Sequence, residues 1–121
     1  MNQFEEPKMW QKAMDIADKV YMLSTAFSRE EKYGLTRQIR RSAVSDASDI
    51  AEGAGNNTRV EFKNFLGKAS GSANQLYPQL VLSHRLKLVH QDQVTPVSSN
   101  AIEVQKMNDT LVKSLENNYV Q

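Results

Sequence analysis

Apolar side chains recur along this chain at alternating spacings of four and three residues, in four stretches separated by residues that favour turns. Such spacing places the side chains on one face of an α-helix, whereas a strand would need alternation at every second residue. In the first stretch the repeat consists of Met9, Ala13, Ile16, Val20, Leu23 and Phe27. No strand-like alternation competes with this repeat anywhere in the sequence. The pattern therefore predicts an all-α chain built from amphipathic helices.

Proline, glycine and capping residues predict where the first two helices begin and end. Pro7 suits a first helical turn, because the N–H that proline lacks has no helical partner there. Ser28 followed by Glu31 has the spacing of a capping box, in which hydroxyl and carboxylate accept from free backbone N–H groups. Gly53 is typical of a helix stop. These signals predict helices over residues 7–27 and 29–53.

The same kinds of signal divide the second half of the chain. Thr58 begins a second capping-box pattern, and Pro96 marks a further helix start. Pro78 falls inside the third apolar repeat, where it removes a backbone hydrogen bond and clashes with the preceding turn. We therefore expect a helix over residues 59–90 with a kink near Pro78, and a last helix over residues 96–117.

Four helices joined by short connections most economically form an up-down-up-down bundle. The 121 residues suffice for one domain, spanning residues 1–121. Folding the second helix back on the third about a midpoint near Asn56 places Ala43 opposite Ala69. Both alanines lie in stretches rich in Ser, Ala and Gly, so we expect the backbones of these two helices to approach closely.

Composition excludes several classes of protein. The chain has no cysteine, which removes thiolate catalysis, cysteine-based zinc sites and disulfides, and fits a reducing cytoplasm. No apolar stretch approaches the ~20 residues that a membrane span needs. The polar, acidic start of the chain lacks the pattern of a secretion signal. We therefore expect a cytoplasmic protein that has no membrane partner.

The sequence contains little material for catalysis. Carboxylate-bridged di-iron bundles need Glu-x-x-His on two helices, and this motif does not occur. His84 and His90 are six residues apart, so a helix would point them to different faces. The nucleophile motifs Gly-x-Ser-x-Gly and Ser-x-x-Lys are absent as well. We expect neither an enzyme nor a bound metal or cofactor.

Asp46, Asp49 and Glu52 recur every three residues on the second helix and form the best carboxylate cluster in the chain. In principle such a cluster holds a cation or performs acid–base chemistry. The structural interpretation is the stronger one, because acids also gather in ordinary ion-pair networks. In that interpretation the two aspartates accept hydrogen bonds from serines or pair with a basic residue of a neighbouring helix or subunit.

Basic residues are the remaining candidates for a functional surface. The candidates are Arg37, Arg40 and Arg41 on the second helix and Arg59 and Lys63 at the start of the third. Positive charge is concentrated in residues 29–41 and 59–87, although the whole chain carries only +1. Such asymmetry suits contact with a phosphate backbone, and by itself it is also typical of a solvated helix face.

Two motifs are more specific than these patterns. The run Leu-Thr-Arg-Gln-Ile-Arg-Arg at residues 35–41 is followed by Ile-Ala-Glu-Gly at residues 50–53. Together with Trp-Gln-Lys-Ala at residues 10–13 and the segment 65–80, these motifs resemble the four-helix-bundle proteins encoded in bacterial 23S rRNA intervening sequences. The resemblance covers nearly the whole chain, and it implies an antiparallel four-helix bundle.

That family is related to the accessory proteins of diversity-generating retroelements, which assemble as pentameric barrels and bind nucleic acid and a reverse transcriptase. The resemblance therefore implies a homopentamer with RNA or DNA, and a reverse transcriptase, as partners. For the intervening-sequence branch itself the biochemical role is not established.

The resemblance also assigns roles to single residues. It makes Arg37, Arg40 and Arg41 the expected contacts with nucleic acid or between subunits. The expected interface or structural positions are Trp10, Asp49, Glu52 and Tyr77. Trp10 suits a subunit contact as well as a core position, because its large ring is flanked by lysines.

This chain departs from the family pattern at several positions. Asp49 stands where Asn is common, and Gln75, Tyr77 and Pro78 replace a stretch that is usually rich in Glu. The third helix near residue 75 faces the level of the arginines, so an acid missing there leaves them less neutralised. We expect a more basic surface than in typical members.

Taken together, these observations predict an all-α antiparallel four-helix bundle that works as a non-enzymatic, oligomeric RNA- or DNA-binding module. The alternative is a structural or protein-interaction oligomer, such as an accessory partner of a reverse transcriptase, in which the arginines form subunit contacts.

Overall fold

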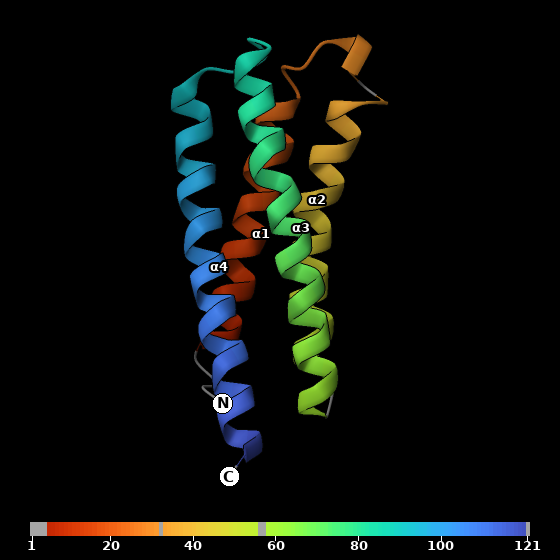
Figure 1. The fold of residues 1–121 in the computed structure, drawn as a ribbon. Coiled ribbons are helices and arrows are strands. Elements are labelled where there is room, and N and C mark those ends of the chain that lie inside the picture. The colour runs from red at the N-terminus through yellow and green to blue at the C-terminus, as the bar shows by residue number, and fades with distance from the viewer. Residues whose placement is uncertain (1–4, 32, 56–57, 121) are drawn as a thin grey trace.

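The computed structural model describes residues 5–31, 33–55 and 58–120 (Figure 1). Its elements, in chain order, are α1 (Glu5–Ser24), the short 3-10 helix η1 (Arg29–Glu31), α2 (Leu35–Gly55), α3 (Arg59–Arg85) and α4 (Gln91–Val120). The all-α class expected from the apolar spacing is confirmed. No helix in the described ranges is both long enough and apolar enough to cross a membrane.

The four helices pack side by side as an antiparallel bundle, with α2 and α3 running in opposite directions next to each other (Figure 1). Each helix contacts two neighbours, in the closed order α1, α2, α3, α4 and back to α1. The contact between α2 and α3 is the most extensive of the four. Ala43 and Ala69, which the sequence placed opposite each other, are both 0% exposed.

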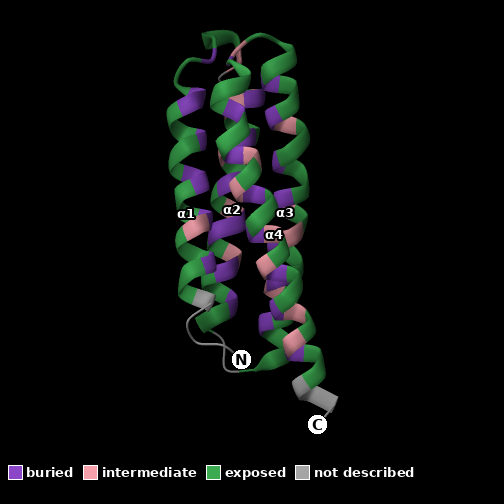
Figure 2. Ribbon diagram, turned by 90° about the vertical axis from the view of Figure 1, so that its left-hand side faces the viewer, coloured by how far each residue is buried: buried purple, intermediate pink, exposed green. Residues whose placement is uncertain are grey.

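One continuous core fills the centre of the bundle, and buried positions form inward stripes along each helix (Figure 2). Every member of the first apolar repeat, from Met9 to Phe27, is buried. The largest side chains below 2% exposure include Leu66, Leu76 and Leu80 on α3. Burial of such apolar surface, at about 25 cal/mol per Å², is the main force that holds the helices together.

The predicted boundaries of the first two helices need correction. α1 ends at Ser24 instead of residue 27, because a turn follows in which Phe27 N–H donates to the Ser24 carbonyl at 3.1 Å. Ser28 does not start α2; its carbonyl accepts from Glu31 N–H at 3.0 Å within η1. α2 begins only at Leu35, whose N–H donates to Glu31 Oε2 at 3.4 Å. The Glu31 carboxylate of the predicted capping box therefore caps α2 at Leu35, and not a helix that begins at Ser28.

Gly53 is not a helix stop. α2 continues through it to Gly55, and no glycine of the described residues adopts a positive φ. A Cβ on Gly53 would lie 2.9 Å from Phe62 Cδ1 and 2.9 Å from Phe65 Cβ, so this glycine lets α3 approach α2. The predicted midpoint at Asn56 lies outside the described residues.

The third helix begins where it was expected to begin. Thr58 is the N-cap, and its hydroxyl accepts from Glu61 N–H at 3.1 Å. Pro78 lies inside α3 without interrupting it. The helix ends at Arg85 instead of residue 90, and Lys87 follows in the left-handed region at φ 62°.

The fourth helix is longer than the sequence suggested at both ends. It begins at Gln91 instead of residue 96 and continues to Val120 instead of residue 117. Pro96 lies inside it, and the Thr95 hydroxyl donates to the Gln91 carbonyl at 3.0 Å instead of capping a new helix. The earlier start has a local cause: the backbone N–H of His90 donates to Gln93 Oε1 at 2.9 Å.

Candidate nucleic-acid interface

The first turns of α2 carry the three arginines that the sequence singled out. Arg37 and Arg41 are exposed, whereas Arg40 is partly buried. Arg40 Nε donates to Ser24 Oγ at 2.8 Å, and its guanidinium lies 4.6 Å from the centroid of the Tyr21 ring. Both partners belong to α1, so Arg40 joins two helices as well as contributing positive charge.

An open groove of about 770 Å³ runs between α1 and α2 beside these arginines. Its lining residues are Tyr21, Tyr33, Thr36, Arg37, Arg40, Arg41 and Val44, and we call it the arginine groove. Three of the seven are arginines, two are exposed tyrosines, and none is acidic. The sequence analysis gave no role to Tyr33, which lies outside the apolar repeat.

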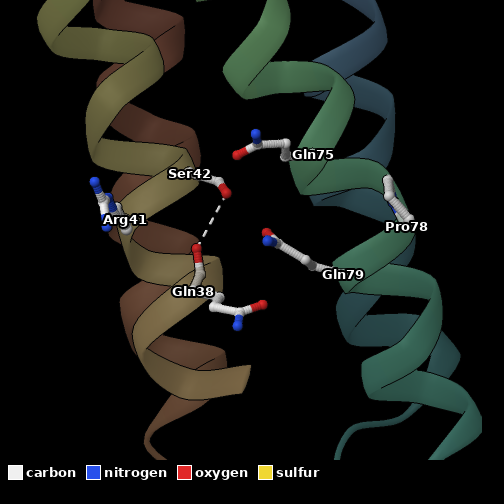
Figure 3. A pocket seen from close by; sticks show the side chains of 6 residues that line it. All are labelled: Gln38, Arg41, Ser42, Gln75, Pro78 and Gln79. Atoms are coloured by element: carbon white, nitrogen blue, oxygen red, sulfur yellow. Dashed lines mark hydrogen bonds between the residues drawn. The ribbon is translucent and has the colours of Figure 1, made fainter. Parts of the chain in front are cut away.

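A second groove, of about 550 Å³, lies between α2 and α3. It is lined by Gln38, Arg41, Ser42, Gln75, Pro78 and Gln79, and we call it the amide groove. Gln75 and Gln79 project from α3 toward α2, while Arg41 projects from α2 away from α3 (Figure 3). Arg41 lines both grooves, because it lies on the ridge of α2 that separates them.

The positive charge of this region is not neutralised by ion pairs within the described part of the chain. Among the residues that the structure describes, neither Arg37 nor Arg41 forms an ion pair. By contrast, Lys63 pairs with Glu116 at 2.8 Å between α3 and α4. The neutral Gln75 faces the amide groove at the level of Arg41, as the departure from the family pattern suggested.

The five predicted nucleic-acid-binding residues do not form a single surface. Arg59 and Lys63 lie at the start of α3, beside the end of α2, whereas the three arginines lie near the beginning of α2. At 1.5 Å per helical residue, these two groups are ~20 Å apart along the bundle. The contact of Lys63 with Glu116 further separates it from the arginines, because it lies on the α4 side of α3.

The carboxylates of α2 occupy different environments. Asp46 is 2% exposed, and its Oδ1 has no hydrogen-bond partner, so the predicted serine contact to this oxygen does not form. Burial, together with the charge of Asp49, raises the pKa of Asp46 to about 7. The pKa of Asp49 is raised by burial and by Glu52 against the opposing effect of Lys68. No three His, Cys, Asp or Glu side chains in the described ranges are placed to hold a metal ion.

The predicted interface residues are mostly accessible. Trp10 is 38% exposed and Tyr77 is 54% exposed, so neither belongs to the core. Met14 and Tyr21, at 40% and 45% exposure, follow Trp10 at spacings of four and seven more residues on the same face of α1. We call these three residues the α1 apolar stripe. The sequence analysis missed Met14, although its spacing from Trp10 was a usable signal.

Comparison with protein-family models identifies the family of this chain. The family model described as 23S rRNA-intervening sequence protein matches residues 5–110. The chain belongs to this family. The resemblance inferred from the motifs of α2 is thereby confirmed, and the family match covers all four helices in whole or in part.

A solved structure agrees with this assignment at the level of the fold. It is the crystal structure of a protein of unknown function from the S23 ribosomal protein family of Bacteroides thetaiotaomicron. The TM-score is 0.81 at 21% sequence identity, over 90% of this chain and 98% of the other. No curated protein matches the chain.

Proposed function

We propose that this protein is a non-enzymatic nucleic-acid-binding module that uses the arginine groove to hold a phosphate backbone. The observation that carries the proposal is the uncompensated charge of Arg37 and Arg41, which are exposed and form no ion pair in the described part of the chain. Guanidinium groups bind phosphate oxygens in a bidentate geometry. Two exposed cations without an ion-pair partner in the described part of the chain therefore favour a polyanion as ligand.

The tyrosines of the groove indicate the form of the nucleic acid. Tyr21 and Tyr33 are exposed aromatic side chains beside the arginines. Unpaired bases stack on such rings, whereas the bases of a duplex are already stacked on one another. The proposal therefore commits to single-stranded or loop segments of RNA or DNA in preference to a duplex.

The test is an anisotropy titration with a labelled single-stranded oligonucleotide at about 50 and about 200 mM salt. We expect the double variant Arg37→Gln/Arg41→Gln to weaken binding about tenfold or more and to reduce the log–log salt slope by about 2. The matched control is Lys19→Gln/Lys106→Gln, which removes two exposed charges outside both grooves. Equal losses in the two double variants would refute a localised phosphate site.

A second pair of substitutions separates the two ends of the bundle. Arg59 and Lys63 were also predicted to bind nucleic acid, but Lys63 is paired with Glu116. We expect Arg59→Gln/Lys63→Gln to weaken binding less than the substitutions in the arginine groove. A larger loss in this variant would move the binding site to the start of α3.

A second candidate function has a specific observation in its favour. The α1 apolar stripe reaches the arginine groove through Tyr21, so the same region suits a contact between subunits. In this alternative the protein is a structural or protein-interaction homo-oligomer, a pentamer by the family resemblance, and Arg37 and Arg41 bind acids of a neighbouring subunit. Dissociation of the particle in the Arg37→Gln/Arg41→Gln variant would favour this alternative, and an intact particle with weakened binding would favour the first.

A further inference from the structure

The amide groove holds a polar atom that the fold leaves without a partner. Gln79 Oε1 is buried and accepts no hydrogen bond from any described residue. A buried acceptor without a donor costs about 1–3 kcal/mol relative to a satisfied one. The two buried serines near the groove do not supply this donor.

Both serines donate their hydroxyl hydrogen to a backbone carbonyl of their own helix. Ser42 Oγ donates to the Gln38 carbonyl at 3.0 Å (Figure 3). Ser83 Oγ donates to the Gln79 carbonyl at 2.8 Å. Neither hydroxyl is therefore free to satisfy Gln79 Oε1. Gln79 Oε1 therefore keeps an unused acceptor position beside the groove.

The surroundings of Gln79 specify the chemistry of such a donor. Three neutral carboxamides, from Gln38, Gln75 and Gln79, line the groove together with one cation, Arg41. Each carboxamide presents an acceptor oxygen beside a donor NH2 group. A ligand that matches this lining has a hydrogen-bond donor beside an acceptor on one planar edge, which can pair with a carboxamide. It also carries a negative charge that can bind Arg41.

A nucleobase attached to its phosphate has these properties. Glutamine binds adenine through the exocyclic amino group and the adjacent ring nitrogen, as a donor and acceptor pair. We infer that the amide groove binds the edge of an unpaired, adenine-type base from the same strand whose phosphates occupy the arginine groove. This inference rests on the proposed nucleic-acid function and adds a base-reading site to it.

The geometry of the two grooves supports a shared strand. Arg41 lines both, so a strand that crosses the ridge of α2 passes from the phosphate-binding side to the amide-lined side. The volume of about 550 Å³ lies within the range of small-molecule sites. The terminal torsion of a glutamine side chain is broad, so rotation of the Gln79 amide turns its oxygen into the groove.

The test compares three labelled probes of equal phosphate number: a single strand of ten adenosines, an abasic strand of ten sugar-phosphates and a ten-base-pair duplex with the charge of one strand masked by neutral linkages. We expect Gln79→Met to weaken binding of the adenosine strand about tenfold and to leave the other two probes within about twofold. The abasic strand has no base to read, and in the duplex the bases are stacked inside the double helix, so none can be splayed out into the amide groove.

Gln11→Met, on the exposed surface of α1, is the matched control and should leave all three affinities unchanged. Gln38→Met, an exposed position across the groove, gives a second variant in case the partly buried Gln79 substitution unfolds the chain. It should also weaken the adenosine strand selectively.

Each outcome separates the inference from the proposed function. Equal effects of Gln79→Met on all three probes, or no effect on any, would overturn the base-reading site. The phosphate site would still stand if binding of the wild type depends on Arg37 and Arg41. A wild-type protein that binds none of the three probes at low salt would overturn both.

Discussion

At the residue scale, Asp46 places a carboxyl group in the interior of the bundle, where its Oδ1 has no hydrogen-bond partner. Ionisation there would leave a charge almost without access to water, so the folded protein retains the proton to a higher pH. The side chain that the sequence analysis weighed as a cation ligand or an ion-pair partner is instead a buried acid whose pKa is raised to about 7.

This environment predicts how stability depends on pH. Between about pH 4 and 7 the unfolded chain has lost the Asp46 proton and the folded chain still holds it, so the free energy of unfolding falls as the pH rises. The full pKa difference, from 3.8 to about 7, corresponds to ~4 kcal/mol as an upper bound. Asp46→Asn removes this group, so we expect it to exceed the wild type in stability at pH 8 by a few kcal/mol and to approach it near pH 4.

Urea unfolding at a series of pH values measures the difference between the two proteins. Asp18→Asn, an exposed position on α1, is the control for loss of one negative charge. If the difference in free energy of unfolding between the wild type and Asp46→Asn stays constant from pH 4 to 8, the raised pKa of Asp46 is contradicted.

At the element scale, the pairing of α2 with α3 depends on which glycines lie in the contact. Gly53 lies where a Cβ would be 2.9 Å from side-chain atoms of both Phe62 and Phe65. Gly71, on the outer side of α3, has no atom within 4 Å of the corresponding position. Both glycines lie within a helix, but only Gly53 is in close contact with side chains of another helix.

The pair predicts opposite effects of one substitution. Gly71→Ala should raise the free energy of unfolding by about 0.5–1 kcal/mol, because alanine loses less backbone entropy in a helix. Gly53→Ala gains the same propensity and must also displace two phenylalanines, so we expect a net loss of about 1–2 kcal/mol. Chemical denaturation of both variants tests this, and a stabilised Gly53→Ala would show that α2 and α3 are farther apart than described.

At the scale of the whole molecule, the α1 apolar stripe is the exposed feature that a subunit contact would best explain. Aromatic side chains and methionine are enriched at protein interfaces, and Trp10, Met14 and Tyr21 lie on one helix face at 38%, 40% and 45% exposure. The stripe is separate from the core stripe of α1, although the Tyr21 ring also contacts the Arg40 guanidinium within the monomer.

We therefore expect the purified protein to scatter light as a homo-oligomer, with five subunits by the family resemblance. Trp10→Glu should dissociate it, because a charge at the centre of an apolar contact is costly to bury. Met22→Glu is the matched control: Met22 is 73% exposed on the same helix but lies about 100° around it from Tyr21. A monomeric wild type, or equal dissociation in both variants, would contradict an interface at the α1 apolar stripe.

The spacing of apolar residues determined most of the fold, because the choice of buried face is a local property of each helix. The repeat of α1 predicted its buried residues from Met9 to Phe27, and Thr58 predicted the start of α3. The same reasoning failed at Ser28, where an identical capping pattern forms a 3-10 turn, and at Gly53, where packing against α3 and not a turn requires glycine. Local sequence signals limit the conformations that a segment can adopt, and packing against the neighbouring helices determines which of them forms.

For the candidate site, the sequence supplied the arginines but not their arrangement. Motif and charge singled out Arg37, Arg40 and Arg41, since a motif is read along the chain. Only the tertiary structure decided that Arg40 binds Ser24 and Tyr21 of α1, that Lys63 is neutralised by Glu116, and that three glutamines meet beside Arg41. These facts depend on the register and rotation of helices that are distant in sequence, and no single segment encodes that geometry.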